Sequence, residues 1–187
     1  MEIDVSKLLE RIRKFSMPDG EIRGRQVRLR QVGELRLSPE RPWCPFRAHQ
    51  VFNGSSLDFR WQAWMKLVPL LPTRVVDAFE GRRGHLTVSM LGFIPIVRAH
   101  GPDINKGEVL RSLAELPWRP FAIRESPQLN WNAISEDCLQ VTYDDGQTRA
   151  EIVLSVDAQG RILGGEAMRP RRDGNRVEEF NVVGNLQ

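Results

Sequence analysis

Gly107-Glu-Val-Leu-Arg-Ser-Leu-Ala-Glu-Leu-Pro-Trp-Arg-Pro120 decides the fold, because it is the one convincing helix in the middle of a chain of short strands and turns. Its apolar residues recur at helical spacing: Val109, Leu110, Leu113 and Leu116. Leu116 precedes a proline and cannot comfortably stay helical, so the helix should end there. We expect a central helix over residues 105–116, laid across a curved sheet of the kind that often encloses a cavity.

Residues 3–16 predict a second, amphipathic helix. Its apolar side chains share one arc: Val5, Leu8, Leu9, Ile12 and Phe15. Three acidic residues among the first ten weaken the basic face that a membrane-surface helix needs. We therefore expect this helix to pack against the body of the protein. No apolar stretch approaches the ~20 residues of a spanning helix, so no membrane span is predicted.

Both flanks of the central helix show the two-residue period of β-strands. Apolar and polar residues alternate in short runs over residues 22–99, where Asn53-Gly54 is typical of a tight hairpin. Residues 121–183 continue the pattern, with a turn at Asp145-Gly146. We predict an α+β, mainly β fold, in which a curved antiparallel half-barrel carries an N-terminal helix and one central helix packed across it.

Length and composition indicate a single domain over residues 1–187. The content of 41% hydrophobic and 27% charged residues excludes wholesale disorder. The net charge is +3, and its surplus lies in residues 1–50, with 11 Lys and Arg against 7 Asp and Glu. Aromatic residues do not alternate with these cations as they do on many nucleic-acid surfaces, so no nucleic-acid partner is predicted.

The cysteines and histidines lack the spacing of a metal site. Cys44 and Cys138 are far apart, and the three histidines are isolated on expected strands. Reduced thiols and the absence of a leader-like apolar segment favour a cytoplasmic location. No glycine-rich phosphate loop follows a strand. We predict no metal, no cofactor and no assigned catalytic residue.

The central helix has a charged stripe opposite its leucine side. Glu108, Arg111 and Glu115 can form an ion-pair ladder on a solvated surface, with each pair contributing about 0.2–0.5 kcal/mol. Alternatively, the stripe faces a cleft, where Arg111 could bind a carboxylate or phosphate and Glu115 would orient it. The two sides are diametrically opposed, so we expect only one of them to face the sheet.

Aromatic residues supply the other candidates. Trp61 shares a strand face with Phe59 and Met65, which suits either a packed core or an apolar ligand pocket. Trp118, just after the helix, fits a core position. The candidate ligand-binding residues are Gln50, Trp61, Asp77, Arg111, Glu115 and Trp118.

Two motifs carry a family resemblance: Trp43-x-Pro-Phe46-x-Ala48-x-Gln50 and Arg111-x-Leu113-Ala114-Glu115-x-x-Trp118-x-Pro120. Over roughly residues 20–170 the chain resembles an uncharacterised bacterial family, a domain of unknown function. More remotely, it resembles lipoprotein carriers of the LolA/LolB type, which implies a curved sheet with an apolar cavity for acyl chains. Family members continue into further strands, whereas this chain stops at Gln187. We therefore expect either a shorter sheet or a truncated C-terminus.

Three functions stay open. The first is a non-enzymatic protein that binds a hydrophobic or amphipathic small molecule. The second is an enzyme that acts on a small anionic substrate through Arg111, Glu115, Asp77 and Gln50. It requires these side chains to converge and one carboxylate to have a perturbed pKa. The third is a structural module that buries its strand edges in a homodimer.

Overall fold

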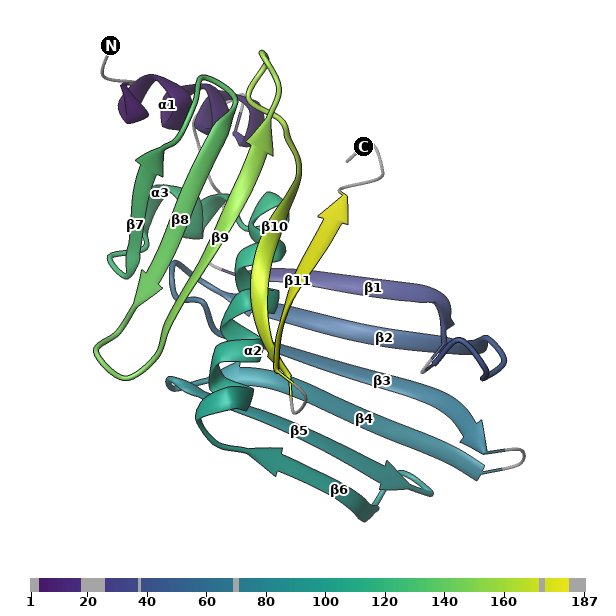
Figure 1. Ribbon diagram of the computed structural model, residues 1–187. Helices are drawn as coiled ribbons and strands as arrows, with labels where there is room; N and C mark the ends of the chain where they lie inside the picture. The colour runs from purple at the N-terminus through teal and green to yellow at the C-terminus, as the bar shows by residue number, and fades with distance from the viewer. Residues whose placement is uncertain (1–3, 18–25, 37, 69–70, 172–173, 182–187) are drawn as a thin grey trace.

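The computed structural model describes residues 4–17, 26–36, 38–68, 71–171 and 174–181, and these form two antiparallel sheets (Figure 1). The first sheet is a meander of six consecutive strands within the described residues. Its strands are β1 (Gln26–Leu35), β2 (Cys44–Asn53), β3 (Phe59–Val68), β4 (Leu71–Glu80), β5 (Arg83–Met90) and β6 (Ile94–His100). The predicted mainly β, antiparallel class is confirmed, and the strands are divided between two sheets.

The second sheet has five described strands in the order β11-β10-β9-β8-β7. They are β7 (Leu129–Ala133), β8 (Cys138–Asp144), β9 (Arg149–Val156), β10 (Ile162–Arg171) and β11 (Gly174–Asn181). The Asp145-Gly146 turn lies between β8 and β9, as predicted. The expected start of the first strand at residue 22 and the expected ends at residues 183 and 187 lie outside the described residues.

Helices connect and cover the sheets. Their bounds are α1 (Val5–Ser16), α2 (Pro102–Ala114), the 3-10 turn η1 (Leu116–Trp118) and α3 (Pro120–Glu125). α1 packs against α3 and β7. The central helix begins three residues before its expected start because proline is well tolerated in a first helical turn. Residues 121–125, expected within the second run of strands, are instead helical in α3 (Pro120–Glu125).

α2 lies between the two sheets and contacts both, β4 and β5 on one side and β9 and β10 on the other (Figure 1). Its leucines belong to a core cluster that includes Leu139 on β8 and Ile152 on β9. Its charged stripe meets the six-stranded sheet, where Arg111 pairs with Asp77 of β4. The expectation that only one side of this helix faces a sheet is therefore wrong, because a separate sheet covers each side.

Gly84 allows α2 to approach the six-stranded sheet closely. A Cβ atom at this position would lie 2.9 Å from the carbonyl oxygen of Ile104, inside the normal contact distance. The amide of Gly84 also donates a hydrogen bond to Asn105 Oδ1 at 2.8 Å. A residue without a side chain on β5 thus fixes the distance between the helix and the strands that carry the site.

The register of the meander arranges the α2-facing side chains of the six-stranded sheet in rows across its strands. The aromatic row contains Val27, Phe52, Phe59, Phe79 and Gly84. The polar row, two residues further along each strand, contains Leu29, Gln50, Trp61, Asp77, Leu86 and Ala99. The small-residue row, two residues further again, contains Gln31, Ala48, Ala63, Val75, Val88 and Val97.

The polar row separates two apolar clusters. Phe52, Phe59 and Phe79 of the aromatic row belong to the main core with α2 and the second sheet. The small-residue row supplies most of a second cluster, formed by Ala48, Ala63, Met65 and Val75. Because side chains two apart on a strand share a face, both clusters and the polar row lie on one side of the sheet.

Candidate functional site

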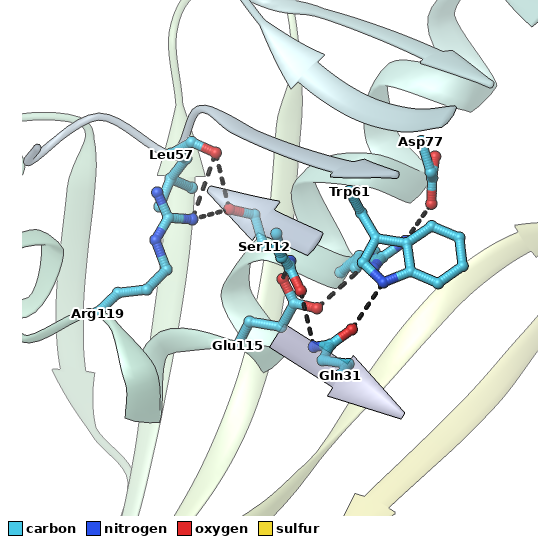
Figure 2. Close-up of polar contacts among 9 residues, drawn as sticks. Gln31, Leu57, Trp61, Asp77, Ser112, Glu115 and Arg119 are labelled. Atoms are coloured by element: carbon cyan, nitrogen blue, oxygen red, sulfur yellow. Dashed lines mark hydrogen bonds and ion pairs between the residues drawn. The ribbon is translucent and has the colours of Figure 1, made fainter. Parts of the chain in front are cut away.

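Six side chains from four strands and α2 form one connected polar network. The polar network consists of Gln31, Gln50, Trp61, Asp77, Arg111 and Glu115 (Figure 2). The strand register brings Gln50, Trp61 and Asp77 side by side. The helical spacing brings Arg111 and Glu115 together above them.

A chain of hydrogen bonds runs from the sheet to the Glu115 carboxylate at the end of α2. The Trp61 indole Nε1 donates to Gln31 Oε1 at 2.7 Å. Gln31 Nε2 donates in turn to Gln50 Oε1 at 3.1 Å, and Gln50 Nε2 donates to Glu115 Oε2 at 2.6 Å. Gln50 is fully buried, so both ends of its amide need a partner, and both have one.

Arg111 is held by carboxylates and aromatic rings together. Its Nε donates to Glu115 Oε1 at 3.2 Å, and its Nη1 pairs with Asp77 Oδ2. The guanidinium carbon lies 5.0 Å from the Phe59 ring centroid and 5.1 Å from that of Trp61. Its planar group can meet carboxylates at its edge and rings at its faces, which a lysine could not do equally well.

The charges of this network do not balance. One guanidinium faces the carboxylates of Asp77 and Glu115, a formal sum of +1 − 2 = −1 when both are ionised. Burial raises the pKa of Glu115, although Arg111 and Gln50 oppose that shift. Burial by itself would lower the pKa of Arg111, but Glu115, Asp77 and Glu108 together raise it above its usual value. The arginine is therefore charged and is surrounded by an excess of acceptors.

A second arginine, Arg119, is buried at the end of the same helical region (Figure 2). Its Nη1 donates to Leu57 O at 3.3 Å and to Ser112 Oγ, while its Nη2 donates to Ser56 O at 2.5 Å and Asp58 O at 3.2 Å. The guanidinium lies 4.8 Å from the Phe52 ring centroid. Burial lowers the pKa of Arg119 to about 10, so it remains charged at neutral pH. It ties the β2–β3 hairpin to α2.

Five of the six residues predicted from the sequence converge in the polar network, and Trp118 does not join them. Trp118 lies on η1 and packs against the main core cluster, the position its sequence context suggested. Two residues of this region were missed, Gln31 and Arg119. Gln31 was detectable, because it occupies an inward position in the alternation of β1 beside Leu29. Arg119 gave no comparable signal.

Two kinds of feature are missing from the described ranges, a metal-binding side-chain cluster and a membrane-spanning helix. Within them, no group of three or more His, Cys, Asp or Glu side chains could hold a metal ion. Over the same ranges, no helix is both long enough and apolar enough to cross a bilayer.

A family model for a family of unknown function, DUF6544, matches residues 8–182, which include both sheets and the polar network. The chain belongs to the DUF6544 family. No curated protein and no solved structure matches this DUF6544 chain. The predicted membership in a family of unknown function is confirmed, while the remoter likeness to LolA/LolB carriers stays a prediction.

The chemical capacity of the site in this DUF6544 protein follows from its unused atoms. Glu115 accepts through both oxygens, and Trp61, Gln31 and Gln50 each donate within the network. Asp77 Oδ1 is buried and accepts no hydrogen bond from the described residues. The capacity left at this carboxylate is therefore that of an acceptor, while Arg111 uses two of its five N–H donors in the bonds to Glu115 and Asp77.

Proposed function

We propose that this protein is a non-enzymatic binding protein for a small amphipathic molecule. The observation that carries the proposal is the polar row, because it places a charged network beside an apolar surface that the main core does not include. The apolar part of the ligand would lie on the small-residue row, and its polar group would meet Asp77 of the polar row. Ligand sites commonly combine a mostly apolar lining with a few convergent polar groups.

The small-residue row forms an apolar surface of short side chains on the sheet. Ala48, Ala63 and Val75 are buried there, and larger side chains that remain half-buried stand around them. Those surrounding side chains are Phe46, Trp61, Leu67, Leu86 and Val88. An apolar ligand would cover the parts of these half-buried side chains that still contact water. Removing apolar surface from water is the main favourable term in such binding.

The internal bonding of Glu115 disfavours a role for this carboxylate as a general base. Glu115 is held by Arg111 and Gln50, and Gln50 is held in turn by Gln31. A general base needs a free lone pair within reach of the substrate proton, and both oxygens of Glu115 already accept hydrogen bonds.

Native mass spectrometry and organic extraction of the purified chain test this proposal. We expect the wild-type protein to carry a small apolar molecule. Val88→Trp should lose it, because the indole would cover the small-residue row. Thr87→Trp is the matched control, since alternate residues of β5 point to opposite faces of the sheet. An empty wild-type protein, or equal occupancy in both variants, would contradict the proposal.

The enzyme alternative keeps specific support. Asp77, Arg111, Glu115 and Gln50 converge within hydrogen-bonding distance, and the pKa of Glu115 is raised by burial, as that hypothesis requires. A carboxyl group with a raised pKa can act as a proton donor closer to neutral pH. The extracted molecule should keep its mass when incubated with fresh protein. Conversion that Glu115→Gln abolishes would favour the enzyme instead.

The homodimer alternative is supported by the edge strand β6. Its side chains Ile94, Ile96 and Val97 are largely exposed, and exposed apolar edges favour strand pairing between molecules. Sedimentation velocity over a concentration series distinguishes a monomer from a homodimer. A single monomeric species throughout would exclude this alternative.

A further inference from the structure

We infer that the polar group of the ligand is a primary ammonium ion and that Asp77 binds it. This inference rests on the proposed function and concerns the same site. It replaces the expectation that Arg111 binds an anionic group. Three features of the polar network support it: its charge, its free acceptor and the position of Asp77.

The charge of the site disfavours an anion. Arg111 pairs with both Asp77 and Glu115, so a single cation is shared between two carboxylates. A carboxylate or phosphate would add to this excess of negative charge, whereas an ammonium ion would offset it. Complementary charge is a main source of specificity at such sites.

Hydrogen bonding at Asp77 also favours a primary ammonium ion as the polar group. Asp77 Oδ2 accepts from Arg111, but Oδ1 is buried and receives no hydrogen bond from any residue that the structure describes. A buried acceptor without a partner is unfavourable, so it favours a ligand that brings a donor. An ammonium group brings three N–H donors, and a carboxylate brings none.

The position of Asp77 allows the rest of the ligand to be apolar. It stands between Trp61 and Leu86 in the polar row, and Val75 and Val88 lie next to it in the small-residue row. Its side chain keeps 14% of its surface exposed. An ammonium group at Asp77 would place an attached alkyl chain along these apolar residues.

The test compares 12-carbon probes with different head groups, each below its micelle-forming concentration, by calorimetry and tryptophan fluorescence at neutral pH. We expect dodecylammonium to bind at least about 10-fold more tightly than dodecanoate, as differential charge pairing implies. Dodecyltrimethylammonium has the charge without N–H donors and should bind less tightly than dodecylammonium. Dodecanoate binding as tightly as the amine would overturn this inference and leave the proposed function standing. Failure of every probe to bind would overturn both.

The Asp77→Asn variant tests whether Asp77 causes the preference for the amine probe over the carboxylate probe. Asparagine keeps the shape and an oxygen for Arg111 but removes the charge, so the preference for amine over carboxylate should fall at least about 10-fold. Glu80→Gln is the matched control, because it removes the same charge from β4 at a position paired with Arg60. Equal preferences in the two variants would contradict the assignment to Asp77.

Discussion

Arg111 and Arg119 lie eight positions apart in the same helical region, yet they meet opposite kinds of partner. Arg111 pairs with two carboxylates, which together with Glu108 raise its pKa. Arg119 donates to three backbone carbonyls and a serine hydroxyl, and its burial lowers its pKa to about 10. Backbone carbonyls belong to a fixed hairpin, whereas carboxylate side chains can exchange partners. The comparison indicates a structural role at Arg119, whereas the carboxylate partners of Arg111 belong to the proposed site.

The largest effect on stability is expected from Arg119→Met. It removes the guanidinium donors from the carbonyls of Ser56, Leu57 and Asp58, of which Leu57 keeps the Ser112 hydroxyl and Asp58 keeps the Asn53 amide. The free energy of unfolding should fall by about 3–5 kcal/mol. Urea denaturation followed by circular dichroism measures this change. Arg124→Met, at an exposed side chain on α3, is the control and should change stability by less than about 0.5 kcal/mol. A loss at Arg119 no larger than at Arg124 would refute the structural role.

Arg111→Met should have a smaller effect on stability and a larger one on binding. Asp77 and Glu115 keep some contact with water, so their unpaired charges are partly solvated. We expect a loss of about 1–3 kcal/mol in the free energy of unfolding. The affinity for the proposed ligand should also change in this variant, because the charge beside Asp77 changes. If Arg111→Met destabilises the chain as much as Arg119→Met, the two arginines have the same structural role.

The smallest expected effect is a pH-dependent difference at Glu115. Its pKa in the folded state is raised above the usual value of 4.5, so the folded chain binds this proton more tightly than the unfolded chain does. The corresponding stabilisation is present at low pH and is lost as the pH rises through the folded-state pKa. The unfolding free energy of Glu115→Gln minus that of the wild type should therefore increase from pH 5 to pH 8. A constant or decreasing difference in urea titrations would contradict the raised pKa.

Much of the fold was readable from periodicity. The amphipathic pattern of residues 3–16 corresponds to α1, and the alternating pattern before the central helix corresponds to strands β1 to β6. The i,i+4 spacing of Arg111 and Glu115 predicted their ion pair, which the structure contains. These predictions succeeded because they depend on which side of an element is apolar, a property that neighbouring residues determine.

The site was harder to read because its parts are far apart in the sequence. Gln50, Trp61 and Asp77 become neighbours only through the register of three strands. Gln31 joins them through side-chain hydrogen bonds rather than through a motif. Arg119 stands between Trp118 and Pro120 with no periodic partner, and its role depends on a hairpin about sixty residues earlier.

The sequence by itself determined most of the elements, their apolar sides and the charged stripe on the central helix, but not α3. Only the tertiary structure decided that the strands form two sheets and that α2 lies between them, with leucines toward one core and charges toward the polar row. The physical reason is that the periodicity of apolar residues indicates which face of a helix or strand is buried, but not which residues cover that face. That covering surface comes from strands distant in the chain, and here it makes the same helix part of the core on one side and part of the candidate site on the other.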